Sequence, residues 1–113
     1  MSANEVAVEA EIQAKGLNAP RLTPDHIDAQ IAGEYSGRAS KLWEGCPTLP
    51  AMECLTTCVL VLKNGFTVVG KSACASPENY NEELGIKIAR EDARKQIWAL
   101  EGYLLRSKLA AAE

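Results

Sequence analysis

Three basic residues share one side of a predicted helix near the end of the sequence. Lys87, Arg90 and Arg94 are spaced i, i+3 and i+7, which places them in a column about 60° wide. Lys71 lies on the strand predicted before this helix. Such a column can bind phosphate oxygens, and Arg90 lies close enough to the apolar stripe to need an anionic partner. The alternative is a solvated face, because Glu83 precedes Lys87 at the spacing of a helix ion pair.

The segment from residue 70 to 81 gathers small and polar side chains where two helix starts are predicted. Helix starts expose unpaired N–H groups, which favour an anion. Asn79 could read a base edge, and Tyr80 or Trp98 could stack on a base, although a capping asparagine and a core tryptophan are the ordinary alternatives. The predicted ligand-binding residues are Lys71, Ser72, Asn79, Tyr80, Lys87, Arg90, Arg94 and Trp98.

Catalytic and metal-binding patterns are weak in this sequence. His26 is the only histidine and falls at a predicted helix start. A histidine-rich metal site is therefore excluded, and a nucleophilic triad would have to recruit His26 from the surface. The sequence contains no glycine-rich phosphate loop. We therefore expect a protein that is not an enzyme, with no catalytic residues, no metal and no cofactor.

The four cysteines leave three chemical states open. Only Cys54 and Cys58 approach the close spacing of zinc ligands, whereas Cys46 and Cys74 stand further away. Cysteine packs as a small apolar residue, and the cytoplasm keeps thiols reduced. Buried free thiols are the favoured interpretation, with a zinc site and disulfides as alternatives.

Length and composition limit the class of protein. The chain has 113 residues, 47% of them hydrophobic and 24% charged, which is typical of one globular domain. The net charge of -3 argues against a general nucleic-acid binder. The longest aliphatic run is residues 59–62, and the first twelve residues are acidic where a signal peptide is basic. We therefore expect no membrane association and a cytoplasmic protein.

The first half of the sequence predicts an arm, a helix and a loop. Residues 1–19 are predicted to form an N-terminal arm with a short helix that frays, and residues 20–113 a single domain. Thr23-Pro24-Asp25 has the composition of a helix start. Ile27, Ile31 and Tyr35 form one apolar stripe, which predicts a helix over about 24–35. Glycines and prolines break every periodicity in the following loop, residues 36–53.

The strongest local signal is the dipeptide Asn64-Gly65. It predicts a two-residue type I′ turn and a β-hairpin over about residues 55–73. Counting outward from this turn pairs Leu60 with Val69 across the hairpin. Both faces then carry aliphatic residues, so both must be covered.

A long helix is predicted over about residues 77–108, with apolar residues on two opposite sides. One side holds Ile86, Ala89, Ala93, Ile97, Leu100 and Leu104, and the other holds Leu84, Ile88, Trp98, Leu105 and Leu109. Two apolar sides need two packing partners, which favours a homodimer or higher homo-oligomer. The predicted fold class is α+β, with a two-stranded antiparallel hairpin packed on a short N-terminal helix and a long C-terminal helix.

Several ordered blocks resemble one family of proteins from tailed phages. The blocks are residues 62–68 (LKNGFTV), 72–74 (SAC), 77–80 (PENY), 88–91 (IARE) and 100–105 (LEGYLL). They resemble the phage gene-product 49/66 family over about residues 20–108. This resemblance implies a protein acting in the cytoplasm of the infected host bacterium. The architecture is also similar to that of the Thoeris anti-defence proteins of phages, small oligomers that sequester cyclic ADP-ribose isomers or cyclic oligonucleotides.

The gene-product 49/66 resemblance itself implies no activity, whereas the similarity to the Thoeris anti-defence proteins implies an anti-defence function without catalysis. We expect a binder that sequesters a nucleotide-derived immune signal, with the basic column on phosphates and Asn79 with Tyr80 on base or ribose. One alternative is a protein that binds a host protein through the exposed hairpin face or the loop around Trp43. A weaker alternative is a small enzyme that degrades the signal. A sponge would require enclosure of the ligand between subunits, because three charge-assisted hydrogen bonds supply only about 4.5 to 9 of the roughly 12 kcal/mol of nanomolar affinity.

Overall fold

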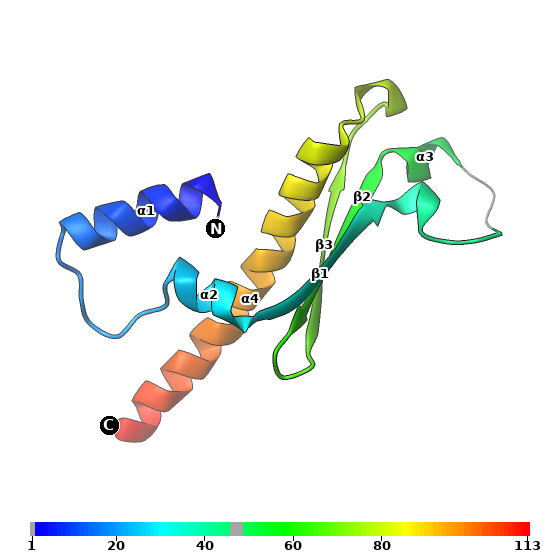
Figure 1. The fold of residues 1–113 in the computed structure, drawn as a ribbon. Helices are drawn as coiled ribbons and strands as arrows, with labels where there is room; N and C mark the ends of the chain where they lie inside the picture. The colour runs from blue at the N-terminus through cyan, green and yellow to red at the C-terminus, as the bar shows by residue number, and fades with distance from the viewer. Residues whose placement is uncertain (1, 46–48) are drawn as a thin grey trace.

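The computed structural model describes residues 2–45 and 49–113 of the chain. The main elements are helix α1 (Ala3–Ala14), helix α2 (Pro24–Gln30), strand β1 (Ile31–Arg38), the short helix α3 (Pro50–Glu53), strand β2 (Leu55–Leu62), strand β3 (Thr67–Ala73) and helix α4 (Glu82–Ala112). Single 3-10 turns occupy Ala39–Lys41 and Pro77–Asn79. In Figure 1, α1 and the sheet lie on opposite sides of the long α4. The α+β class is confirmed.

The sheet has three antiparallel strands in the order β1-β2-β3, so the prediction of a two-stranded hairpin was wrong in strand number. The predicted helix over 24–35 ends at Gln30, and the chain continues as a strand. The residues of the predicted helical stripe therefore do not share one environment. Ile27 is buried, whereas Tyr35 on β1 is 68% exposed. Two glycines, Gly33 and Gly37, disfavour a helix in this segment. The predicted loop over 36–53 consequently contains the end of β1 and α3.

The hairpin is present, but its turn and register differ from the prediction by one residue. Gly65 has a φ of 90°, and no described residue other than glycine has a positive φ. Asn64 therefore cannot take part in a type I′ turn, which needs positive φ at both central residues. The loop gains one residue, and Leu60 lies opposite Val68 instead of Val69. This shift reverses the two faces of β3 and places Val68 in the core.

Helix α4 contacts the sheet closely because small residues line the contact. A Cβ atom added to Gly70 on β3 would meet the backbone of Ala89 and Ala93. A Cβ atom added to Gly85 would lie 2.6 Å from the hydroxyl oxygen of Thr56 on β2. These glycines let the helix backbone approach the sheet to a distance that larger residues exclude.

The core lies between α4 and one face of the sheet. Ala89, Ala93 and Ile97 of the first predicted apolar side belong to it, whereas Leu100 and Leu104 of that side are exposed. The core comprises Ile27, Cys58, Leu60, Leu62, Val68, Ala89, Ala93 and Ile97. The other predicted apolar side of α4 is covered unevenly. Trp98 packs against the core, whereas Leu84 and Ile88 are about half exposed.

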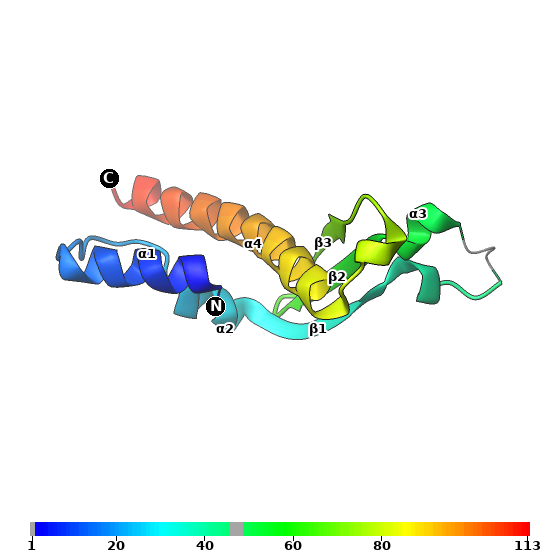
Figure 2. The same ribbon diagram turned by 90° about the horizontal axis from the view of Figure 1, so that it is seen from above.

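The opposite face of the sheet, called the outer sheet face below, is covered by no helix among the described residues, although the side chain of Leu42 lies against it at Gly37 (Figure 2). Its residues stand in three cross-strand rows: Gly33, Val61 and Thr67; Tyr35, Val59 and Val69; Gly37, Thr57 and Lys71. Tyr35 and Val69 are both more than half exposed. The middle row is thus an apolar stripe open to a partner.

Side chains of α4 also bind the free edge of β3. The backbone N–H of Lys71 donates to Asp92 Oδ2 at 3.0 Å. Gln96 Nε2 donates to the carbonyl oxygen of Val69 at 2.5 Å. These bonds satisfy backbone groups that an edge strand otherwise offers to another strand.

Helix α1 begins with a capping box. Glu5 N donates to Ser2 Oγ at 3.1 Å, and Ser2 N donates back to Glu5 Oε1 at 3.0 Å. No residue of α1 is buried. The arm therefore forms a regular helix that rests on the domain without joining its core.

Three cysteines fall within the described residues and carry free thiols. Cys54 and Cys58 are buried, and Cys74 is half-buried. Burial raises the pKa of both Cys54 and Cys58 above the ordinary thiol value. Cys46 lies outside the described residues. In the part that the structure describes, no helix is both long and apolar enough to cross a membrane.

Candidate functional site

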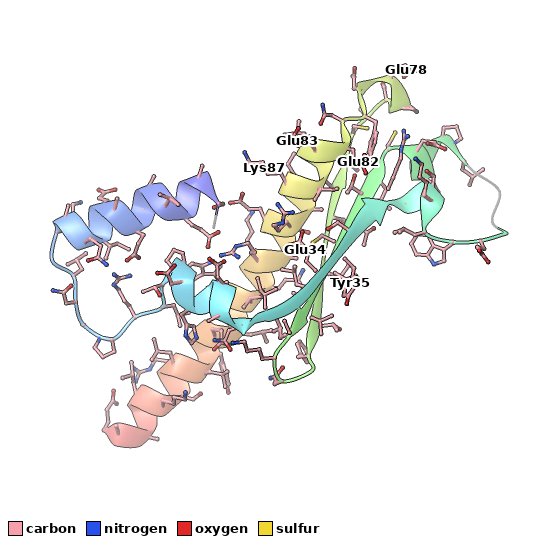
Figure 3. All side chains as sticks on the ribbon, viewed as in Figure 1. Glu34, Tyr35, Glu78, Glu82, Glu83 and Lys87 are labelled. Atoms are coloured by element: carbon pink, nitrogen blue, oxygen red, sulfur yellow. The ribbon has the colours of Figure 1, made fainter. Side chains whose placement is uncertain are left out.

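A hollow of the described surface lies between the start of α1 and the first half of α4. Its volume is about 640 Å³, within the range of small-ligand sites. The three residues of the predicted basic column, Lys87, Arg90 and Arg94, all line it. Figure 3 places Lys87 on the side of α4 that faces the start of α1. The helical spacing therefore brings the column into one hollow.

Arg90 has an internal carboxylate partner on β1. Its Nε donates to both oxygens of Glu34, at 2.9 and 2.8 Å, and its Nη2 donates to Glu34 Oε2 at 2.6 Å. The Arg90 side chain is still 43% exposed. The anionic partner expected for this arginine is thus Glu34, and the Nη1 group points to no carboxylate among the described contacts.

Arg94 is almost fully buried and joins three helices. Its Nε and Nη2 each donate to one oxygen of Glu5 at 2.8 Å, and its Nη1 donates to Asp28 Oδ1 at 2.5 Å. Trp98 Nε1 donates to Glu5 Oε2 at 3.1 Å. Burial alone would raise the pKa of Glu5, but hydrogen bonds from Arg94 and the Ser2 backbone lower it from 4.5 to about 2. The Glu5 carboxylate is therefore ionised and held by four N–H donors, two from Arg94 and one each from Trp98 and the Ser2 backbone.

The polar segment after the hairpin forms a separate, smaller hollow. Ser72, Asn79 and Tyr80 line a space of about 100 Å³. The Tyr80 hydroxyl is buried without a hydrogen-bond partner. The guanidinium carbon of Arg38 lies 3.8 Å from the centroid of the Tyr80 ring. Tyr80 thus already stacks on a cation, where a base was expected.

The eight predicted ligand-binding residues therefore divide among different surfaces. The basic column lines one hollow, and Trp98 lines an adjoining one of about 320 Å³ between α1 and α4. The three residues of the polar segment line the small third hollow. Lys71 belongs to the outer sheet face. The structure brings together only the column and Trp98.

Sequence reasoning missed the three carboxylates that hold the arginines, Glu34, Glu5 and Asp28. Glu34 is 56 residues from Arg90, and Glu5 is 89 residues from Arg94. Glu5 carries a detectable signal, because Ser2 and Glu5 have the spacing of a capping box. That pattern indicates a helix start, but it does not indicate which cation Glu5 contacts.

The described residues contain no group of three or more potential metal-ligating side chains. What the large hollow offers is a mixed electrostatic surface, with the basic column beside Glu83 and Glu91. Such an arrangement can bind and orient an anionic group.

Comparison with known proteins identifies one family. The model of the phage protein (N4 Gp49/phage Sf6 gene 66) family matches residues 22–109. No curated protein and no solved structure matches the chain. The matched region runs from the segment before α2 almost to the end of α4 and leaves out α1. The chain belongs to the phage protein (N4 Gp49/phage Sf6 gene 66) family.

Proposed function

We propose that the protein is a non-enzymatic binder that withholds a nucleotide-derived signal of bacterial immunity, such as a cyclic ADP-ribose isomer or a cyclic oligonucleotide. The observation that carries this proposal is the hollow of about 640 Å³ into which three cationic side chains of α4 converge. Its size suits a small ligand, and cationic side chains in a row suit phosphates.

Lys87 and Arg90 are the ligand-binding residues of this proposal. Lys87 has no ion-pair or hydrogen-bond partner among the described contacts, so its ammonium group is available. Arg90 binds Glu34 through Nε and Nη2, which leaves Nη1 for a phosphate oxygen. Arg94 is paired with Glu5 and Asp28 while α1 is docked, and in that state it supports the wall of the hollow.

The proposed binder is a homodimer or higher homo-oligomer. The roughly 4.5 to 9 kcal/mol of three charge-assisted bonds falls short of the about 12 kcal/mol of nanomolar affinity. Enclosure of the ligand between subunits would supply further contacts. The row of Tyr35, Val59 and Val69 on the outer sheet face is an apolar surface suited to a second copy. This face points away from the hollow, so enclosure of the ligand needs a further subunit contact over the hollow itself.

Equilibrium filtration tests this proposal directly. Purified protein is mixed with cyclic dinucleotides, cyclic trinucleotides and cyclic ADP-ribose isomers, and each compound is quantified after removal of the protein and again after heat release. We expect stoichiometric depletion of one compound and its intact recovery. Lys87→Ala and Arg90→Ala should each lose most of this depletion, whereas Lys108→Ala, an exposed lysine distant in sequence from the hollow, should retain it. Altered products would instead indicate an enzyme.

A second candidate function is binding of a host protein. The observation that favours it is the exposure of Tyr35 and Val69 on the outer sheet face. In this case the protein captures a host protein from a lysate, Tyr35→Lys abolishes the capture, and Lys87→Ala preserves it. If Lys87→Ala abolishes the activity of the protein and Tyr35→Lys preserves it, the signal binder is favoured.

A further inference from the structure

One carboxylate of the N-terminal helix fills a receptor built by α4. Glu5 accepts two parallel hydrogen bonds from Arg94 and a third from the indole N–H of Trp98. Arg94 is only 5% exposed, so its guanidinium is fixed by its surroundings. A planar guanidinium fork with an adjacent N–H donor matches the oxygens of a carboxylate or a phosphate.

The rest of α1 holds to the domain weakly. No residue of the helix is buried, and Val6 and Val8 are each about half exposed. A hollow of about 320 Å³, lined by Val8 and Trp98 among others, remains between α1 and α4. The other strong contact of α1 joins Glu9 to Arg21, which belongs to the segment that links α1 to α2. Glu5 is therefore the main polar contact between α1 and α4.

A linker joins α1 to the domain, and α1 also lies outside the region that matches the family. Residues 15–23 form no helix or strand. Gly16 in this linker has a φ of 65°, a conformation that glycine adopts readily. Arg94 and Trp98 lie within the family-matched region, whereas Glu5 lies outside it. The receptor thus lies within the matched region, and its occupant lies before that region.

The receptor adjoins the hollow of the proposed function. Arg94 and Glu91 line both the large hollow and the hollow between α1 and α4. Ser2 and Ala3, at the start of α1, form part of the wall of the large hollow. Departure of α1 would therefore open the two hollows into one surface and release the Arg94 fork.

We propose that α1 is a displaceable latch: Glu5 occupies in cis an anion site formed by Arg94 and Trp98, and an acidic group of a ligand, a phosphate or a carboxylate, takes its place when α1 lifts away. The inference deepens the proposed function and rests on it only for the identity of the ligand. Anions bind only when the latch is open, so their apparent affinity is the intrinsic affinity multiplied by the fraction of molecules with the latch open.

The test compares Glu5→Gln with Glu11→Gln in the full chain. Glu11 lies on the same helix but pairs only with exposed Lys15, so it is a matched control. Inorganic pyrophosphate is the probe, and its binding is measured by calorimetry. Amide hydrogen exchange of residues 3–14 and 89–97 reports the two helices separately. We expect Glu5→Gln to speed exchange in α1 and to tighten pyrophosphate binding about tenfold, as a latch closed about nine-tenths of the time requires.

In the unmodified protein, saturating pyrophosphate should speed exchange in α1 and leave residues 89–97 protected. The inference is overturned if pyrophosphate does not bind, or if Glu5→Gln changes neither α1 exchange nor pyrophosphate affinity relative to Glu11→Gln. Displacement of α1 by pyrophosphate without binding of any cyclic nucleotide would refute the proposed function and support the latch. Tight binding of a cyclic nucleotide with α1 still protected would support the function and overturn the latch.

Discussion

Helix α4 makes two contacts of opposite physical character. On one side, Gly70 of β3 lies against Ala89 and Ala93 so closely that a methyl group would not fit. On the other side, Glu5 of α1 is held by Arg94 at hydrogen-bond distance, while no residue of α1 is buried. Close apolar packing yields only when the domain unfolds, whereas a charged contact can exchange partners. The difference indicates that α1 can detach from an intact domain.

The largest expected effect is that of Gly70→Ala. The added Cβ would overlap the backbone of Ala89 and Ala93, and we expect a loss of about 3 kcal/mol or more of unfolding free energy. Gly102→Ala is the control, because its Cβ would make only an ordinary contact with Leu22 at 3.8 Å. That change should stabilise the helix by up to about 1 kcal/mol. Urea melts check both values, and equal stabilities would contradict the close contact.

The next effect is that of Ile97→Ala in the same contact. Ile97 is fully buried, whereas Leu104 on the same helix is about half exposed. We expect Ile97→Ala to lower the unfolding free energy by about 3 kcal/mol and Leu104→Ala by less than about 1 kcal/mol. Thermal melts of the two variants give this comparison. A larger loss for Leu104→Ala would show that the core extends along the distal half of α4.

Acid should weaken the contact of Glu5 with Arg94 more than it weakens the packing of α4 on the sheet. The pKa of Glu5 is about 2 in the folded protein against 4.5 for an ordinary glutamate, so its contribution is complete above about pH 4.5 and is lost as the pH falls toward 2. Arg94 stays charged over this range. Asp28 also forms an ion pair with the Arg94 guanidinium. We expect α1 docking to lose about 2 kcal/mol between pH 7 and pH 2, after allowance for solvent screening.

Amide exchange at several pH values, corrected for the intrinsic exchange rate, measures this loss. The α1 amides should lose protection before residues 89–97 do. In Glu5→Gln the difference between pH 7 and pH 3 in α1 should shrink to the part due to Glu9, whose pKa is also lowered to about 2 by its hydrogen bond with Arg21. A pH dependence of α1 protection as large in this variant as in the unmodified protein would assign the effect to other groups.

The smallest effect is expected for the exposed ion pair of Arg90 with Glu34. A surface pair contributes about 1 kcal/mol or less, although its geometry here is bidentate. Glu34→Gln should therefore melt within about 1 kcal/mol of Glu78→Gln, a change at an exposed glutamate. A loss above about 3 kcal/mol would place Arg90 among the structural residues, with Arg94.

Part of this fold follows from local patterns. The Asn64-Gly65 dipeptide correctly predicted a hairpin, and the 3.6-residue periodicity predicted the buried side of α4 through Ala89, Ala93 and Ile97. The pattern missed β1, because Ile31 and Tyr35 follow Ile27 at helical spacing by coincidence. The register was wrong by one residue, because only Gly65 adopts a positive φ. A single backbone conformation thus decided which face of β3 is buried.

The candidate site shows a similar limit. Helical spacing placed Lys87, Arg90 and Arg94 together correctly. The pairing of Arg90 with Glu34 and of Arg94 with Glu5 depends on how distant elements meet. No local pattern encodes such pairings. The basic column is therefore readable from the sequence, but its degree of neutralisation is not.

Hydrogen exchange of the unmodified protein in rising denaturant tests the central claim, the independence of α1 from the domain, most directly. We expect the amides of residues 3–14 to exchange through local openings of low free energy that respond weakly to denaturant. Amides from Ala93 to Ile97 should exchange only through global unfolding, with a strong response. If both sets show the same opening free energy and the same denaturant dependence, α1 is part of the cooperative core and the latch does not exist.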